Sequence, residues 1–257
     1  MQSLTAKFEE LRRSGEKALV LFVTAGDQPI EDLPDVLNFL EDAGADVIEV
    51  GIPFSDPFGE GPTIQASSQR SLDRGVNPQL VLDSVAKAHP SIPVVTMGYY
   101  NPVLRFGLEN FARESHAAGV TGTIISDLIP DEADAWCRAS AENHLETIFL
   151  AAPTSTEGRL KQVAERSTGF VYAVSRTGVT GAESSVPQDV PTFVQRIRSF
   201  TEKPICVGFG ISNAAQAKEV ARIADGIVVG SALVAAADHS TDEALALAVS
   251  LRNALDT

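Results

Sequence analysis

The sequence has few of the residues that hold metals or form disulfides. Its 257 residues include two cysteines and four histidines. Cys137 and Cys206 lie far apart and form no Cys-x-x-Cys motif, and the histidines are scattered along the chain. Zinc sites and disulfide frameworks need closely spaced Cys and His residues. We therefore expect no metal site, and two reduced thiols that suit a cytoplasmic protein.

Positive charge and long apolar runs are also scarce. Lys and Arg number 20 against 34 Asp and Glu, a formal net charge of −14, and no basic cluster stands out as a nucleic-acid surface would require. The longest apolar run, Ala18–Val23, is much shorter than the roughly 20 residues that span a bilayer. Residues 1–15 lack a signal-peptide pattern. These features predict a cytoplasmic protein that binds a small molecule, with no nucleic-acid or membrane partner.

Short apolar runs alternate with longer amphipathic stretches along the chain. Such alternation is typical of a parallel sheet whose strands are joined by helices, and continuous apolar strands indicate burial on both faces. Near the start, Leu4, Phe8 and Leu11 have helical spacing and precede the first strand. Eight strands are predicted, at Ala18–Thr24, Asp46–Val50, Ile92–Met97, Gly122–Ser126, Glu146–Leu150, Phe170–Val174, Pro204–Gly208 and Gly226–Val229.

Eight β/α units favour one fold class over its main competitor. A doubly wound dinucleotide-binding sheet would carry Gly-x-Gly-x-x-Gly after its first strand, and that motif is missing there. A length of 257 residues is usual for one α/β barrel, and no linker or low-complexity segment divides the chain. We predict a single domain over residues 1–257, a (β/α)8 TIM barrel with an extra N-terminal helix. The active sites of such barrels lie at the carboxyl ends of the strands.

The Asp46–Val50 strand contains an acidic residue, Glu49, among apolar neighbours. Both faces of such a strand are dry, so a carboxyl group there is unfavourable unless it is paired or functional. Burial would also raise its pKa, which suits proton transfer. The sequence leaves two interpretations open, a catalytic group and a carboxylate held by a structural partner. In the loop that follows, two glycines flank Glu60, and the Ser-Asp-Pro turn around Asp56 favours a structural role.

Glycines follow the last two predicted strands, in Gly208-Phe209-Gly210 and in Gly230-Ser231. Backbone N–H groups at glycines and at helix N-termini bind anions, and these two loops are the usual phosphate position in the fold. Tight turns without a ligand are the alternative. The longer Ser175–Pro187 loop is rich in small residues and is predicted to be a lid, with a surface loop of no function as the other possibility.

Several of these segments resemble one family. The segment Glu49-x-Gly-x-Pro-Phe-Ser-Asp-Pro, with Gly61-Pro-Thr-Ile-Gln65 after it, is similar to the signature of tryptophan synthase α subunits. The similar segments run in register over essentially the whole chain, so the sequence is identified as a member of that family. The others are Phe22–Asp27, Tyr99–Pro102, Asp127–Pro130, Ser175–Gly181, Gly208–Ser212 and Gly230–Ala232.

The resemblance implies a lyase of tryptophan biosynthesis that cleaves indole-3-glycerol phosphate, by a retro-aldol reaction, into indole and glyceraldehyde 3-phosphate. It assigns Glu49 as the acid–base group at indole C3 and the glycerol hydroxyl, and Glu60 as the carboxylate at the indole N–H. It assigns the phosphate site to Gly181, Phe209, Gly210, Gly230 and Ser231. The implied indole pocket consists of Phe22, Met97, Tyr99, Ile124, Tyr172 and Val228, for which core packing is the alternative.

One position departs from the family pattern. The second carboxyl group is normally Asp in a Leu-Ala-Asp-Gly-Pro context, whereas this chain has Phe58-Gly59-Glu60 before Gly-Pro. Glutamate reaches one methylene further, about 1.5 Å, and a misplacement of about 1 Å can lower a rate by about a hundredfold. We hypothesise that Gly59 lets the backbone withdraw, so that the Gly59–Glu60 pair preserves the carboxylate position.

The resemblance also implies a partner. Members of the family bind a β subunit that carries pyridoxal phosphate, in an allosteric αββα heterotetramer, while the α subunit itself needs no cofactor. Arg176 and Thr180 of the predicted lid are implied in the coupling between the subunits. The implied contact residues are Asp56, Pro57, Asn101, Pro102, Asp127 and Pro130.

Other functions remain open on the sequence. Another phosphate-binding barrel, such as an indole-glycerol phosphate synthase or a phosphosugar isomerase, is disfavoured because a synthase is expected to carry a catalytic lysine on a strand, and none is identified. The Glu60 change keeps open a weakly active α-like binding module that allosterically activates a β subunit. A stand-alone indole lyase that needs no partner is a further variant.

Overall fold

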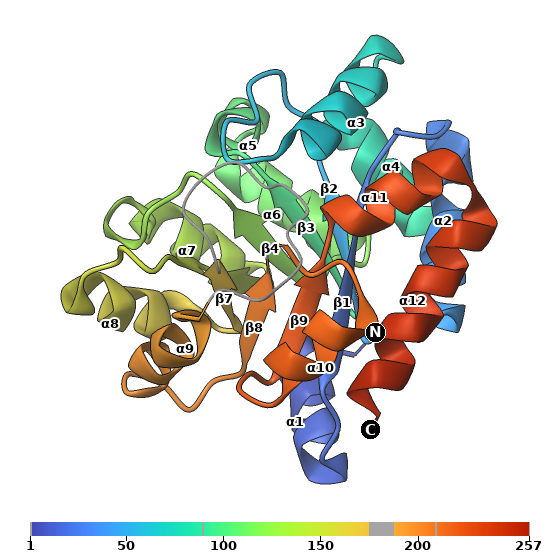
Figure 1. The fold of residues 1–257 in the computed structure, drawn as a ribbon. Helices are drawn as coiled ribbons and strands as arrows, with labels where there is room; N and C mark the ends of the chain where they lie inside the picture. Colours follow the sequence, from blue (N-terminus) through green and yellow to red (C-terminus); the bar gives the residue numbers. More distant parts are fainter. Residues whose placement is uncertain (1, 89, 175–187, 209, 257) are drawn as a thin grey trace.

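The computed structural model describes residues 2–88, 90–174, 188–208 and 210–256. In these residues nine parallel strands form one sheet, which curls into a nearly closed barrel inside a ring of helices (Figure 1). The predicted (β/α)8 TIM barrel is confirmed. The sheet order is β5-β4-β3-β2-β1-β9-β8-β7-β6. The strands are β1 Ala18–Thr24, β2 Val47–Gly51, β3 Val94–Gly98, β4 Gly122–Ile125, β5 Glu146–Ile148, β6 Leu150–Ala151, β7 Val171–Val174, β8 Ile205–Gly208 and β9 Gly226–Val229.

The additional strand arises from an interruption in a predicted one. The predicted Glu146–Leu150 strand is divided at Phe149 into β5, which pairs with β4, and β6, which pairs with β7. The Phe149 N–H donates to the Ser167 side chain (3.1 Å) and not to a neighbouring strand. The continuous chain through Phe149 joins the two ends of the sheet and closes the barrel.

Twelve α-helices and two short 3-10 helices lie among the described residues. The helices expected between the strands are confirmed, and α3, α5 and α11 were not predicted. The buried face of α3 consists largely of serines, which weakens the apolar pattern. None of the described helices combines the length and apolar character needed to cross a membrane. The α-helices are α1 Leu4–Ser14, α2 Leu33–Asp42, α3 Pro62–Asp73, α4 Pro78–Ala88, α5 Tyr100–Phe106, α6 Leu108–Ala117, α7 Asp134–Glu142, α8 Glu157–Arg166, α9 Val190–Arg198, α10 Ala214–Ala221, α11 Ser231–His239 and α12 Thr241–Leu255, and the 3-10 helices are Ile30–Asp32 and Pro130–Glu132.

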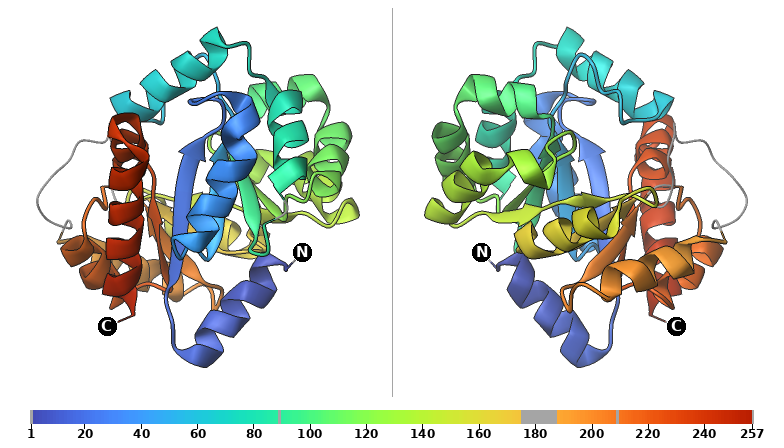
Figure 2. Two further views of the ribbon diagram at one scale, coloured as in Figure 1. Left: turned by 90° about the vertical axis from the view of Figure 1, so that its right-hand side faces the viewer. Right: turned by 90° about the vertical axis from the view of Figure 1, so that its left-hand side faces the viewer.

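The predicted N-terminal helix, α1, lies below the barrel at the amino ends of the strands (Figures 1 and 2). Its buried side chains Leu4, Phe8 and Leu11 belong to the apolar cluster inside the barrel. Leu4 packs closely on two glycines, because a Cβ added to Gly122 or to Gly169 would lie 2.8 Å from Leu4 Cδ1. The helix therefore closes one end of the barrel and leaves the other end for a site.

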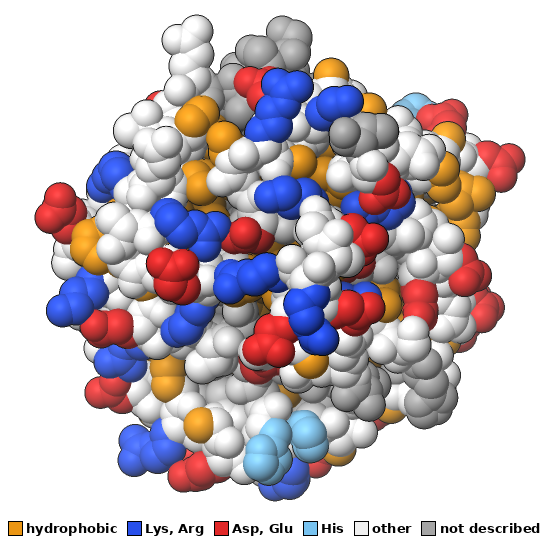
Figure 3. Space-filling view, turned by 90° about the horizontal axis from the view of Figure 1, so that it is seen from below, with side chains coloured by type: hydrophobic (Ala, Val, Ile, Leu, Met, Phe, Trp, Pro, Cys, Tyr) orange, Lys and Arg blue, Asp and Glu red, His pale blue; other side chains and the backbone are white. Residues whose placement is uncertain are grey.

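Charged side chains of both signs are interspersed on the face seen from below (Figure 3). Asp46, just before β2, accepts hydrogen bonds from Arg252 of α12 (2.8 Å) and from the Leu19 N–H of β1 (2.9 Å). The ammonium group of Lys7 on α1 lies 3.8 Å from the same carboxylate. This network ties both ends of the chain to the first two strands.

Candidate active site

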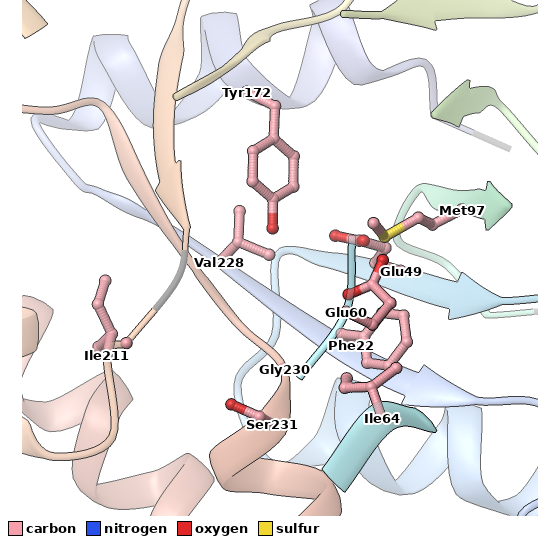
Figure 4. Close-up of a pocket in the computed structure, with 11 residues that line it drawn as sticks. Phe22, Glu49, Glu60, Ile64, Met97, Tyr172, Ile211, Val228, Gly230 and Ser231 are labelled. Carbon is pink, nitrogen blue, oxygen red and sulfur yellow. The ribbon is translucent and has the colours of Figure 1, made fainter. Parts of the chain in front are cut away.

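A pocket opens at the carboxyl ends of the strands, on the side of the barrel away from α1. Its lining comes from β1, β2, β3, β7 and β9 and from segments that follow β2, β8 and β9 (Figure 4). Ile64 and Ile211 also line it and were not predicted, although both lie within the motifs that carry the family resemblance. The predicted site residues that meet in this pocket are Phe22, Glu49, Glu60, Met97, Tyr172, Gly210, Val228, Gly230 and Ser231.

Two aromatic side chains of the pocket lie over glycines of the neighbouring strand. A Cβ added to Gly51 of β2 would lie 2.5 Å from the Phe22 ring, and a Cβ added to Gly208 of β8 would lie 2.4 Å from the Tyr172 hydroxyl oxygen. A side chain at either position would collide with the ring. The glycines that end these strands therefore allow the aromatic rings to form the pocket walls.

Glu49 lies inside the barrel, opposite Phe22 of β1 and Val95 of β3 in the strand register. The residue is 1% exposed, and its Oε2 atom has no hydrogen-bond partner among the described residues. Burial first, and the charge of Glu60 second, raise the Glu49 pKa to about 8. The group is thus mainly protonated at neutral pH. Of the two interpretations that the sequence left open, the unpartnered oxygen favours the catalytic one.

Glu60 lies in the loop between β2 and α3, with its carboxyl group beside that of Glu49 (Figure 4). Burial raises the Glu60 pKa to about 7, and a hydrogen bond from Tyr99 works in the opposite direction. The Gln65 side chain donates to the Glu60 carbonyl oxygen (2.8 Å), which fixes the end of the loop against α3. With both pKa values near neutrality, the two carboxyl groups together hold about one proton there.

The opposite side of the pocket is formed by backbone after β8 and β9. Gly210 has a φ of 87°, a left-handed conformation that favours glycine. Gly230 precedes α11, which begins at Ser231. N–H groups in the first turn of a helix have no acceptor within the helix, and the helix dipole adds partial positive charge. This side of the pocket can therefore hold an anionic group.

Not all predicted residues lie in the pocket lining. Ile124 of β4 is not among the residues that line the pocket, and is buried in the cluster inside the barrel to which Phe22, Met97, Tyr172 and Val228 also belong. Tyr99 lines a small neighbouring cavity that shares Glu60, Phe22 and Met97 with the pocket. The remaining predicted residues lie outside the described part of the chain, namely Arg176, Thr180, Gly181 and Phe209, with the Ser175–Pro187 segment.

The predicted partner-contact residues surround the pocket, after β2, β3 and β4. Asp56, Asn101 and Asp127 are exposed, but Asp127 also has a structural contact, since its carboxylate accepts the Tyr100 N–H (2.7 Å). Pro130, in contrast, is buried at the start of a 3-10 helix, while its neighbours Ile129 and Asp131 are exposed. Pro57 and Pro102 are half-buried. In the described part of the chain, no group of three or more His, Cys, Asp or Glu residues is placed to hold a metal ion.

The comparisons with known proteins agree with one another. The family model described as tryptophan synthase alpha chain matches residues 8–254. The tryptophan synthase alpha chain of Geobacter sulfurreducens is 48% identical over 91% of this chain and 89% of its own length, and that of Dehalococcoides mccartyi is 45% identical over 93% and 96%. Among solved structures, a Mycobacterium tuberculosis tryptophan synthase chain superimposes with a TM-score of 0.94 at 40% identity, and a Legionella pneumophila alpha subunit with 0.89 at 32%. The first covers 100% of both chains, and the second covers 100% of this chain and 99% of its own.

The fold and the pocket define a (β/α)8-barrel enzyme with a pair of neighbouring carboxyl groups at the carboxyl ends of its strands. More particularly, the chain belongs to the tryptophan synthase alpha chain family. Its function is that of the family: it is a lyase of tryptophan biosynthesis that cleaves indole-3-glycerol phosphate to indole and glyceraldehyde 3-phosphate. Nothing in the comparisons favours the alternative of a weakly active binding module.

Proposed function

We propose that Glu49 and Glu60 carry out the cleavage as an acid–base pair. The observation that carries this proposal is their position: both carboxyl groups line one pocket, and burial raises the pKa of each toward neutrality. A carboxyl group with a pKa near the working pH transfers protons efficiently in both directions. The two groups therefore supply the proton transfers that a retro-aldol cleavage needs.

Glu49 serves first as an acid and then as a base. In its protonated form it gives a proton to indole C3, which breaks the conjugation of the indole ring and leaves positive charge at the ring nitrogen. The Glu49 carboxylate then takes the proton of the adjacent glycerol hydroxyl. The C–C bond breaks, its electron pair restores the indole ring, and the hydroxyl-bearing carbon becomes the aldehyde. Glu49 ends as it began, protonated, so protons and electrons balance.

Glu60 stabilises the intermediate. Its carboxylate accepts a hydrogen bond from the indole N–H, which becomes more acidic when C3 is protonated, and its negative charge compensates the charge on the ring. An ionised carboxylate in a site with little water makes a strong hydrogen bond of this kind. This role requires Glu60 to be ionised while Glu49 is protonated, and the order of their pKa values, about 7 and about 8, supports that state.

The pocket has separate regions for the two ends of the substrate. We place the phosphate at Gly210, Gly230 and Ser231, where backbone N–H groups at the start of α11 favour an anion. The indole ring lies among Phe22, Met97, Tyr172 and Val228, which join the inner barrel cluster. Gly181 and Phe209 of the proposed phosphate site, and Arg176 and Thr180 of the proposed lid, belong to the segments that the structure does not describe.

We infer that the face around the pocket binds the β subunit, which in this family carries the pyridoxal phosphate. Three large apolar side chains are exposed after β2, β3 and β4: Phe58 (72% exposed), Leu104 (53%) and Ile129 (40%). These three strands are neighbours in the sheet, and exposed apolar side chains gathered on one face mark interaction surfaces. A subunit docked there would receive indole directly from the pocket. The setting we propose is the cytoplasm, in keeping with the free thiols Cys137 and Cys206.

Indole release from indole-3-glycerol phosphate tests the proposal. The parent chain and the variant Glu49→Gln are assayed with and without a β subunit. We expect the parent to turn over and β to accelerate it, whereas the variant loses at least about a hundredfold in kcat, the usual contribution of a general acid–base group. Equal rates for parent and variant would remove Glu49 from the mechanism.

A further inference from the structure

The side chain of Tyr99, just after β3, reaches across to the loop that carries Glu60. Its hydroxyl oxygen accepts the Gly59 N–H (3.1 Å) and lies 3.5 Å from Glu60 Oε1. The ring is 5.0 Å from the Phe54 ring in a stacked arrangement, and 5.3 Å from the Phe58 ring in an edge-on one, measured between centroids. Tyr99 is only 4% exposed, so its position is set by the Pro53–Glu60 loop around it.

The hydrogen-bond directions at the hydroxyl are fixed by chemistry. Because the oxygen accepts the Gly59 N–H, its own proton is free to point to the Glu60 carboxylate. Burial, and the charge of Glu60, raise the Tyr99 pKa, so the phenol stays protonated at neutral pH and acts toward the carboxylate as a donor. A phenol donor of this kind favours the ionised form of Glu60.

Gly59 is the position that makes this contact possible. A Cβ added there would lie 3.2 Å from the Tyr99 hydroxyl oxygen, closer than ordinary van der Waals contact. Any larger residue would push the hydroxyl away from the loop or the loop away from the hydroxyl. The contact with Tyr99, which follows β3, therefore explains why the glycine and the longer glutamate occur next to each other.

We infer that Tyr99 is a positioning residue, whose hydroxyl holds the Glu60 carboxylate at the pocket wall and for which Gly59 leaves the necessary space. The inference rests on the proposed function of Glu60, and it adds Tyr99 to the residues on which that function depends. Three residues from two segments, Gly59, Glu60 and Tyr99, form one unit that sets where the second carboxylate lies. The unit includes Gly59 and Glu60, two of the three positions at which this loop departs from the family pattern.

The variant Tyr99→Phe tests the inference, because it removes only the hydroxyl and keeps the ring between Phe54 and Phe58. We expect kcat for indole release to fall by about 10- to 100-fold, the effect of losing one hydrogen bond to a charged group, while KM changes by less than about threefold. The acid limb of the pH–rate profile should move to higher pH, because Glu60 loses the donor that lowers its pKa. The matched control is Tyr100→Phe, which makes the same chemical change at the next residue. This control should leave kcat and the pH–rate profile unchanged.

A second variant and a second measurement separate the outcomes. Gly59→Ala should lower kcat as Tyr99→Phe does, and the double variant should lose no more than the larger single loss, since both remove one contact. The Glu60 titration is followed in the ligand-free chain by NMR of 13C-labelled glutamate, assigned with Glu60→Gln. A raised midpoint in Tyr99→Phe supports the contact whether or not the chain turns over. An unmoved midpoint overturns the inference, and an inactive parent overturns the proposed function separately.

Discussion

At the residue scale, the pocket places two carboxyl groups where both cannot be ionised without cost. Glu49 has no hydrogen-bond partner for Oε2 among the described residues, and the Glu60 charge raises its pKa further. Like charges close together in a dry site push the two pKa values apart, so that one group keeps its proton. This asymmetry gives two chemically identical groups different roles, one as the acid and the other as the carboxylate.

The exchange of Glu60 for aspartate tests the fit between the loop and the side chain. In Glu60→Asp the carboxyl group falls short by about 1.5 Å, and we expect kcat/KM to fall by about 10- to 100-fold, in line with the cost of misplacing a catalytic group. The double variant Gly59→Ala/Glu60→Asp restores the usual family pair and should recover much of the loss. A kcat/KM for Glu60→Asp well above that of the parent would contradict the coupling of positions 59 and 60.

The pH dependence of kcat/KM follows from the two pKa values. Activity requires Glu60 to be ionised, so it rises with pH through about 7, and requires Glu49 to be protonated, so it falls with pH through about 8. We expect a bell-shaped pH profile of kcat/KM with its maximum between these two pKa values. Initial rates of indole release in buffers of constant ionic strength measure it. A rate that keeps rising well beyond the upper value would show that Glu49 does not act as the acid.

At the scale of the elements, two strands end in glycines that shape the site. Gly51 and Gly208 end β2 and β8 and accommodate rings from the adjacent strands. At the other end, α1 closes the barrel, and Glu146 at the start of β5 accepts hydrogen bonds from the Leu4 N–H (2.7 Å) and the Thr5 N–H (3.1 Å) in its first turn. The carboxylate satisfies donors that have no partner within the helix. The helix is therefore both packed and capped by the barrel.

Truncation of the α1 contact tests its contribution to stability. Leu4 is fully buried against the barrel interior, and we expect Leu4→Ala to lower the free energy of unfolding by about 2–5 kcal/mol, the range for large-to-small core substitutions. The matched control is Leu245→Ala on α12, where the side chain is 37% exposed and the loss should be much smaller. Urea denaturation followed by circular dichroism measures both. Equal losses would mean that α1 does not seal the barrel.

At the scale of the whole molecule, the two ends of the chain meet. Arg252 of α12 donates to Asp46 (2.8 Å) and to the Lys17 carbonyl oxygen (3.1 Å), which lies just before β1. These contacts support the prediction that residues 1–257 fold as one domain, which stays a prediction. They also leave the carboxyl-end face free of the chain termini (Figure 1), where the proposed partner would dock.

Partner binding is tested on that face. We expect Leu104→Asp to weaken the affinity for a β subunit by at least about tenfold, since a charge would replace an apolar side chain in the proposed interface. Val249→Asp is the matched control, because Val249 is a similarly exposed apolar residue on α12. Isothermal titration calorimetry gives both dissociation constants. If both variants bind like the parent, the partner contacts another surface.

The prediction from sequence succeeded where the pattern is local. The barrel follows from the alternation of apolar runs and amphipathic stretches, and nine of the eleven residues that line the pocket were expected from the family resemblance. The sequence pattern did not predict α3, because its buried face includes Ser67, Ser68 and Ser71 and so lacks a continuous apolar stripe. The family resemblance also assigned Ile124 to the indole pocket, whereas in the structure Ile124 is buried inside the barrel and is not among the residues that line the pocket.

The sequence by itself determined the fold class, the family and the two acidic candidates, because strand and helix periods and short motifs are written in neighbouring residues. Only the tertiary structure decided the closure of the barrel at Phe149, the effect of the Glu60 charge on the Glu49 pKa, the raised pKa of Glu60 itself, and the contact of Tyr99 with Gly59 and Glu60. Burial, charge and hydrogen bonding at a group depend on what other strands bring to it, and those strands lie tens of residues away in the chain.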